Sequence, residues 1–155
     1  MRRLFRKETV VVVLSLMFLI ASRAPAHAQG PGVRAGVSVD PDQFYFGGHY
    51  ETGELIDRLH FRPNLEVGVG DDVTTVAGNF EVIYKIPVKN RRGTSFYVGG
   101  GPAINWYDTE NNSDAEAGFN LLGGIEFNER FFFEVKGGLA DSPDLKIGIG
   151  YTFRR

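Results

Sequence analysis

The strongest constraint on the fold is an alternation of apolar residues with polar or small ones, which repeats from residue 33 to residue 153. Successive side chains of a β-strand point to opposite faces, so a period of two predicts strands with one apolar face. The run at 61–70 shows this: Phe61, Leu65 and Val67 alternate with Arg62 and Glu66. Clusters rich in Asp, Asn, Gly and Pro interrupt the alternation and predict turns. Eight runs result, at residues 33–39, 44–50, 61–70, 76–86, 96–106, 117–127, 131–139 and 145–153.

After residue 33 no segment has helical spacing, so the sequence predicts an all-β fold of consecutive antiparallel hairpins. Two kinds of barrel share this pattern. A soluble lipocalin-like barrel turns its apolar face inward, around an apolar ligand, whereas an outer-membrane barrel turns that face toward lipid and fills its interior with polar side chains. The alternation alone leaves both open.

The content of the two faces favours lipid. The polar face carries charges of both signs in mid-strand, and these are Arg34, Arg62, Glu66, Glu81, Lys85, Glu126, Glu134, Lys136 and Lys146. The apolar face is rich in aromatic residues near the strand ends, with Phe61, Tyr84, Phe96, Phe127, Phe131, Tyr151 and Phe153 expected at one rim and Phe44, Phe46 and Trp106 toward the other. Aromatic girdles that flank an aliphatic band are typical of a spanning barrel. We therefore predict an eight-stranded antiparallel up-and-down transmembrane β-barrel, with a lumen closed by a network of salt bridges.

The connections separate by charge. Alternate connections of an up-and-down barrel share one end, and one set, at 40–42, 70–72, 108–116 and 141–144, holds ten acidic residues and no Lys or Arg. The other set, at 51–60, 89–93 and 128–130 with the tail at 154–155, holds seven basic residues and four acids. In an outer-membrane barrel both termini face the periplasm, so the acidic rim is expected outside. The connection at 108–116 is the longest predicted loop.

The acidic connections also contain candidate ligands for Ca²⁺ or Mg²⁺, because carboxylates supply hard oxygens. The candidates are Asp40, Asp42, Asp71, Asp72, Asp141 and Asp144. Divalent ions there would bridge the rim to lipopolysaccharide phosphates, which the acids alone repel. No connection matches an ordered calcium-binding loop, so a solvated acidic surface is the competing interpretation.

Residues 1–28 are predicted to be a secretory signal peptide that is cleaved after Ala28. Four basic residues precede an apolar run at 10–21, and a small-x-small site follows at 26–28. The run has 12 residues, whereas a transmembrane helix needs about 20. The remaining domain, residues 29–155, carries 12 basic and 18 acidic residues. It has no basic excess for a nucleic acid, and the chain has no Cys for disulfides or thiolate chemistry.

Four segments carry a resemblance to a known family: FYVGGG at 96–101, GGIEF at 123–127, EVKGG at 134–138 and IGIGYTF at 147–153. From about residue 33 to 153 the chain resembles the small eight-stranded outer-membrane barrels, of the OmpX type and of the transmembrane part of the OmpA type. The resemblance implies insertion by the barrel-assembly machinery, which reads a terminal aromatic residue, here Phe153. Two features depart from the family pattern. Arg154 and Arg155 follow that aromatic residue, and Pro102 lies inside a strand, where it predicts a bulge. In contrast to OmpA-type proteins, the chain is expected to have no peptidoglycan-binding domain after the barrel.

The same fold also hosts lipid A acyltransferases and deacylases that use His and Ser. After residue 28 the chain has two histidines, His49 and His60, and neither lies in a His-x-Ser motif. We therefore expect a non-enzymatic outer-membrane protein of a Gram-negative cell without a cofactor, acting as a compact scaffold or a surface-interaction protein. The alternatives are ion conduction through the charged lumen, a soluble ligand-binding barrel and a lipid A-modifying barrel enzyme.

Overall fold

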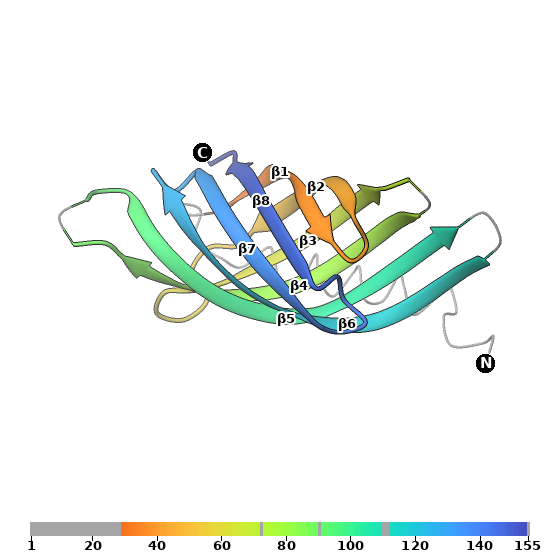
Figure 1. Ribbon diagram of the computed structural model, residues 1–155. Coiled ribbons are helices and arrows are strands. Elements are labelled where there is room, and N and C mark those ends of the chain that lie inside the picture. Colours follow the sequence, from red (N-terminus) through yellow and green to blue (C-terminus); the bar gives the residue numbers. More distant parts are fainter. Residues whose placement is uncertain (1–28, 72, 90, 110–111, 155) are drawn as a thin grey trace.

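A computed structural model describes residues 29–71, 73–89, 91–109 and 112–154, which form a closed barrel. The strands are β1 (Gly30–Val39), β2 (Gln43–Glu51), β3 (Leu59–Val69), β4 (Thr74–Pro87), β5 (Thr94–Thr109), β6 (Asn112–Phe127), β7 (Phe131–Ala140) and β8 (Leu145–Thr152). Each strand pairs antiparallel with the next, and β1 pairs with β8 (Figure 1). The predicted all-β, eight-stranded, up-and-down topology is confirmed. The predicted signal peptide lies outside the described residues.

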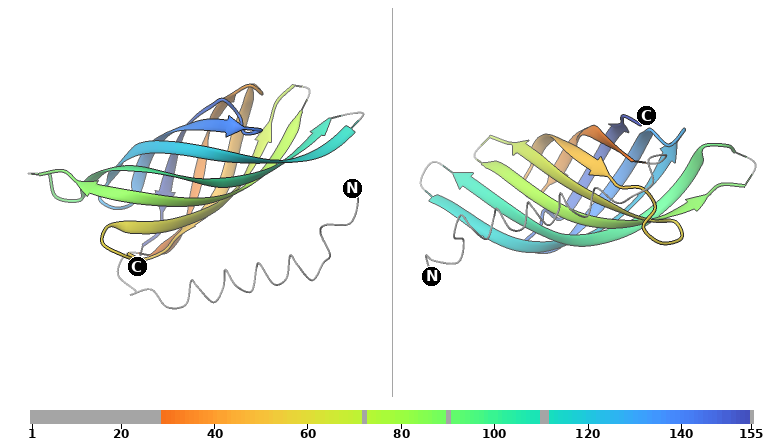
Figure 2. Two further views of the ribbon diagram at one scale, coloured as in Figure 1. Left: turned by 90° about the horizontal axis from the view of Figure 1, so that it is seen from below. Right: turned by 180° about the vertical axis from the view of Figure 1, so that it is seen from behind.

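The chain enters and leaves the barrel at the same end. The Phe153 N–H donates to the Pro31 carbonyl at 2.7 Å, so the start of β1 lies beside the end of β8. The connections β2–β3, β4–β5 and β6–β7 share this end, and the other four connections lie at the opposite end (Figures 1 and 2). The described residues contain no helix long and apolar enough to cross a membrane.

Tight turns fix the register at the terminal end. In the β6–β7 turn Asn128 and Glu129 both have positive φ, and the Arg130 N–H donates to the Phe127 carbonyl at 3.0 Å. Two positive-φ residues in such a turn match the right-handed twist of a hairpin. In the β4–β5 turn the positive φ falls on Gly93, which has no Cβ to clash.

The predicted loop at 108–116 is wrong. Pairing between β5 and β6 continues to Asp108↔Ser113 and Thr109↔Asn112, whereas pairing between β6 and β7 begins only at Gly118↔Ala140. The β5–β6 hairpin therefore projects beyond the β7–β8 connection (Figures 1 and 2). Asp and Asn are depleted in strands, so their abundance here suggested a loop. Once β5 and β6 are paired, their backbone hydrogen bonds continue beyond the end of β7. This part of the hairpin therefore forms strands even though its side chains give it no apolar face.

The predicted bulge at Pro102 is also wrong. The β4–β5 register is the same on both sides of the proline, with Asn79↔Ala103 before it and Val82↔Gly100 after it. No extra residue is inserted, and the ladder only lapses opposite Pro102, while the β5–β6 ladder continues through Pro102↔Phe119. The wall accommodates the proline by giving up local pairing on one side.

The barrel is apolar outside and polar inside. Phe44, Leu121 and Phe96 are 56%, 53% and 52% exposed on the outer wall, whereas Arg62 and Glu81 are fully buried within the lumen. A soluble barrel that binds an apolar ligand requires the opposite arrangement, so this alternative does not fit the structure.

Candidate functional site: the charged lumen and the two rims

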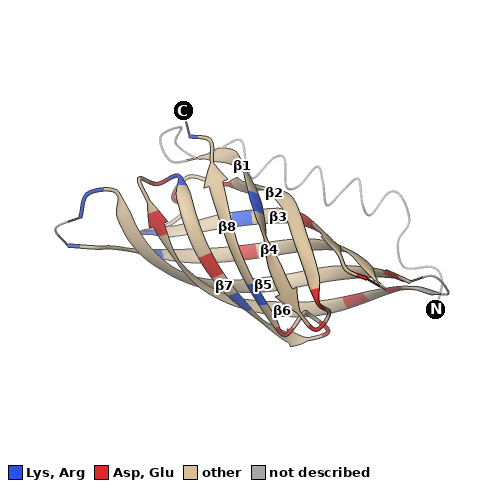
Figure 3. Cartoon of the chain, turned by 45° about the horizontal axis from the view of Figure 1, so that its top comes forward, with Lys and Arg blue, Asp and Glu red and all other residues tan. Residues whose placement is uncertain are grey.

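The charged lumen is the main candidate site. All nine charged residues predicted for the lumen are buried. They come from six of the eight strands. None of the nine comes from β2, and β5 contributes Tyr97 and small residues such as Ala103 instead. The structure adds two further charged groups, Glu51 at the end of β2 and Arg154 beyond β8. Figure 3 shows positively and negatively charged positions along the strands of the barrel, with acidic residues gathered at the end opposite the termini.

One cluster of ion pairs closes the terminal end of the lumen around Glu51. This carboxylate accepts from Arg62 Nη2 at 2.5 Å, from Lys85 Nζ at 2.6 Å and from Arg154 Nη2 at 2.5 Å. Lys85 Nζ also donates to Glu126 at 2.6 Å. Three cations thus share two carboxylates, and each cation comes from a different part of the chain.

A second cluster lies farther along the lumen around Glu66. Lys146 Nζ donates to this carboxylate at 2.8 Å, and Lys136 Nζ lies 3.3 Å from it. Lys136 Nζ also lies 2.5 Å from Glu81. Arg34 contacts the Glu66 and Glu81 carboxylates at 3.5 and 3.6 Å and donates to Glu134. Most cations here have more than one carboxylate partner, which offsets the cost of burying them.

Arg62 joins the two clusters. Its Nη1 lies 3.4 Å from Glu134, while its Nη2 binds Glu51. The guanidinium group lies 4.8 Å from the Tyr97 ring centroid and 4.6 Å from that of Phe132, distances typical of cation–π contacts. The rings need room: a Cβ at Gly150 would overlap the Phe132 ring. Glycine on the inner face therefore makes space for the aromatic residues that hold Arg62.

A chain of side-chain amides continues this network. Asn120 Nδ2 donates to Asn79 at 2.8 Å, Asn79 Nδ2 to Asn64 at 2.7 Å, and Asn64 Nδ2 to Glu81 at 2.8 Å. The three amides come from β6, β4 and β3 and satisfy one another across the lumen. Each amide is held by a hydrogen bond to a side chain of another strand. Together these side chains fill the lumen and close it as a plug.

The two candidate catalytic histidines face the lumen. His49 Nε2 lies 2.9 Å from Thr152 Oγ1, and His60 Nδ1 lies 3.1 Å from the Thr52 carbonyl. Both side chains are buried. Neither histidine has a serine among its hydrogen-bond partners in the described part of the chain. The arrangement needed to activate a serine nucleophile is not formed around them.

The predicted aromatic residues of the terminal rim lie on the outer wall. The rings of Phe127 and Phe131 stack at 6.4 Å between centroids, and those of Tyr151 and Phe153 meet edge to face at 5.2 Å. Cross-strand pairing of Phe131 with Tyr151 connects the two pairs. Of the other members predicted for this rim, Tyr84 and Phe96 are exposed and Phe61 is half-buried. Trp106, predicted for the opposite rim, is exposed as well.

The acidic end contains a hollow of about 410 Å³. Its lining residues are Asp40, Pro41, Val73, Tyr107, Asp114, Glu116, Asp141, Ser142 and Asp144. Three of the six metal candidates are thus brought to one hollow. Asp42 and Asp71 are not among its lining residues, and Asp72 lies outside the described residues. Among the residues that the structure describes, no three His, Asp or Glu side chains are placed to share a metal ion.

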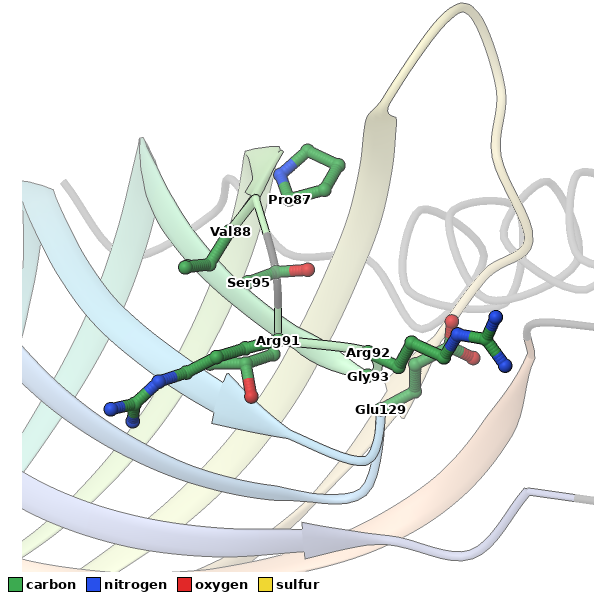
Figure 4. Close-up of a pocket in the computed structure, with 8 residues that line it drawn as sticks. Pro87, Val88, Arg91, Arg92, Gly93, Ser95 and Glu129 are labelled. Atoms are coloured by element: carbon green, nitrogen blue, oxygen red, sulfur yellow. The ribbon is translucent and has the colours of Figure 1, made fainter.

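A second hollow, of about 460 Å³, lies at the terminal end beside the β4–β5 turn. Arg91, Arg92 and Glu129 are its charged lining residues. In Figure 4 the side chains of Arg91 and Arg92 leave opposite sides of the turn. Their guanidinium groups do not converge on one point, as a bound anion would require.

Glu51 and Arg154 were missed as lumen residues, although the alternation contained a signal for both. Glu51 continues the inward-facing series of Tyr45 and His49, and Arg154 continues that of Thr152. Both residues were assigned to connections or to the tail because charge is expected there. In the structure both side chains are buried in the lumen because they form ion pairs there, Glu51 with Arg62 and Arg154 with Glu51.

We predict that Arg154→Gln lowers the stability of the barrel by about 1–2 kcal/mol, because hydrogen bonds to charged groups contribute about that much. Glu51 would keep Arg62 and Lys85 as partners, so the loss is moderate. Urea unfolding of the protein in lipid vesicles measures it, followed by the fluorescence of Trp106, the single tryptophan. Arg154→Lys should lose less than Arg154→Gln. Equal losses would show that the charge of residue 154 is irrelevant.

Comparison with known proteins agrees with this fold. No family model matches the chain, and no curated protein sequence matches it. Among solved structures, the crystal structure of the N-terminal β-barrel domain of Pseudomonas aeruginosa OprF is similar, with a TM-score of 0.58 and 17% sequence identity. The match covers 83% of this chain and 100% of that one. It confirms the fold implied by the resemblance to small eight-stranded barrels.

Proposed function

We propose that the chain is an integral outer-membrane β-barrel protein that acts as a compact, non-enzymatic scaffold or surface-interaction protein. The main support for this proposal is that apolar side chains lie outside and charged side chains inside, the reverse of a water-soluble protein. Large apolar side chains of all eight strands cover the outer wall, whereas the charges are buried inside. Only a hydrocarbon environment stabilises such a wall, and a closed barrel is the form in which β-strands cross a membrane.

The filled lumen favours a scaffold over a diffusion pore. An eight-stranded barrel has an interior just wide enough for side chains. Here ion pairs, amides and the buried cluster of Ile83, Tyr97, Leu122 and Phe132 occupy it. A conducting path would require several of these contacts to open together.

Membrane fractionation followed by gel electrophoresis of unboiled and boiled samples in detergent tests the proposal. We expect the protein in the outer-membrane fraction, with faster migration of the unboiled sample, because the closed barrel stays compact until it is heated. A soluble periplasmic protein without a mobility shift would refute the proposal.

The non-enzymatic part has a separate test. His49→Ala and His60→Ala should leave the heat-dependent shift and any cellular phenotype unchanged, because both rings make lumen contacts only. A phenotype lost in His49→Ala while the mobility shift persists would instead indicate catalysis at that histidine.

A further inference from the structure

The β2–β3 connection at the terminal end presents apolar side chains beyond the strands. Leu55 and Ile56 are 44% and 73% exposed, and Ile56 is the most exposed large apolar side chain in the described part of the chain. Connections of a barrel are usually polar, since they face water. An apolar side chain at this place therefore calls for a partner other than water.

Backbone hydrogen bonds hold this loop in a defined shape. The Leu55 N–H donates to the Leu59 carbonyl at 2.8 Å, and the Leu59 N–H donates to the Ile56 carbonyl at 2.7 Å. The Lys85 N–H of β4 donates to the Arg58 carbonyl at 2.9 Å, which ties the loop to the wall. Arg58 has a positive φ, as a tight turn requires. The exposure of Ile56 is thus fixed by the fold of the loop.

Ile56 lies on the lipid-facing side of the barrel. It forms a β-bridge with Leu59, which in turn pairs with Tyr84 of β4. Residues directly opposite each other in an antiparallel pair share one face, and Tyr84 is exposed on the outer wall. The apolar surface of the wall therefore continues onto the loop. This continuity favours the bilayer that surrounds the wall as the partner of Ile56.

The β4–β5 turn at the same end adds positive charge next to the wall. The last lipid-facing pair of these two strands is Ile86↔Phe96, and the exposed Lys89, Arg91 and Arg92 follow within six residues. The headgroup region is about 5–7 Å thick on each side of the hydrocarbon core, so long basic side chains reach the phosphates from there. Because the guanidinium groups of Arg91 and Arg92 diverge (Figure 4), they suit two separate lipids rather than one anion.

The sign of the exposed charges at this end favours anionic lipid. Among the described residues its connections expose five basic and three acidic side chains, which are Arg58, Lys89, Arg91, Arg92 and Arg130 against Glu54, Asp57 and Glu129. The described connections of the opposite end expose only acids. A surface that combines an apolar residue with cations binds best to membranes that contain anionic lipid.

We propose that the β2–β3 loop and the β4–β5 turn form an interfacial anchor that binds anionic phospholipid in the leaflet at the terminal end of the barrel. Ile56 enters the boundary of the hydrocarbon core, and Lys89, Arg91 and Arg92 bind lipid phosphates. The anchor rests on the proposed function, because it requires the outer wall to lie in a bilayer. In the cell the leaflet is the periplasmic one, since the termini face the periplasm.

The depth of Ile56 is measured with a fluorescent label. The chain has no Cys, so Ile56→Cys carries a single NBD group, and the full chain is reconstituted in vesicles of phosphatidylcholine brominated in the acyl chains. We expect blue-shifted emission and roughly half the quenching found for Val98→Cys on the wall. Asp57→Cys, in the same turn, should emit as in water. Labelled variants that retain the heat-dependent gel shift are compared.

The wall label separates the anchor from the proposed function. Quenching at position 98 without quenching at position 56 would overturn the anchor and leave the membrane barrel intact, and would turn the loop into a surface for a periplasmic protein. Loss of quenching at both positions would overturn both.

The choice of lipid is measured beside the β4–β5 turn, with the label on Phe96→Cys. The vesicles contain equal parts of phosphatidylcholine and phosphatidylglycerol, with the bromine on one lipid at a time. We expect brominated phosphatidylglycerol to quench about twofold more than brominated phosphatidylcholine. Arg91→Gln with Arg92→Gln should remove this difference, whereas Arg91→Lys with Arg92→Lys should retain it.

Two results would overturn the lipid assignment. One is equal quenching by the two brominated lipids in the parent sequence. The other is a preference that inorganic phosphate abolishes when chloride of the same ionic strength does not, because the turn would then bind a free anion instead of a lipid headgroup.

Discussion

Glu66→Gln should be among the most destabilising conservative substitutions in the chain, with a loss of about 3–5 kcal/mol in the free energy of unfolding, because removing one partner of a buried ion pair leaves an uncompensated charge. Glu66 is the carboxylate partner of Lys146, and both side chains are buried. Lys136 and Arg34 keep Glu81 and Glu134 as partners, so the stranded charge is that of Lys146. Urea unfolding in lipid vesicles, followed by Trp106 fluorescence, measures the loss.

A second variant separates the stranded charge from a general defect. In the double variant Glu66→Gln with Lys146→Met the lumen no longer holds the unpaired ammonium group, so most of the stability should return. Asp57→Asn is the matched surface control, because the contact of Asp57 with Arg58 is long, at 3.9 Å, and exposed. It should leave the unfolding midpoint unchanged. If the double variant were no more stable than Glu66→Gln alone, the ion pair would not be the cause.

The alternation of the sequence was sufficient to predict the eight strands and their facing, because only one of the two faces of each strand places Arg62, Glu81 and Lys136 inside a barrel. A slip of one residue would have turned each of these charges toward lipid. The separation of acidic from basic connections followed from the same strand count. For this reason the order of the strands, the facing of their side chains and nine of the charged lumen residues were predictable without the structure, whereas Glu51 and Arg154 were not.

The pairing of individual charges was not predictable. Glu126 and Glu134 are both inward in the sequence pattern, but only the stagger of the closed barrel places Lys85 on the first and Arg34 on the second. Hairpin length was also hidden, since residues 108–116 lack the apolar face on which the strand prediction relied. The distance by which the β5–β6 hairpin projects depends on where β7 ends, and no local pattern within β6 specifies that.

Leu121→Arg should lower the stability of the protein in a bilayer by about 2–4 kcal/mol, the range for Arg at the lipid-facing midplane of a spanning barrel. Leu121 is 53% exposed and lies on β6 midway between Ala115, which is paired with Trp106, and Phe127 at the terminal rim. Its neighbours in the ladder are Gly100 and Gly137, so the longer side chain meets lipid rather than protein.

Ala115→Arg is the matched control on the same strand and the same face. Because Ala115 lies beside Trp106 near the opposite interface, the same charge should cost about 0–1 kcal/mol there. The difference between the two variants therefore measures depth in the membrane, independently of the strand propensity of arginine. On a wall that faced water both substitutions would be nearly neutral. Equal and small losses at the two positions would thus contradict the outer-membrane assignment, even if the barrel itself were intact.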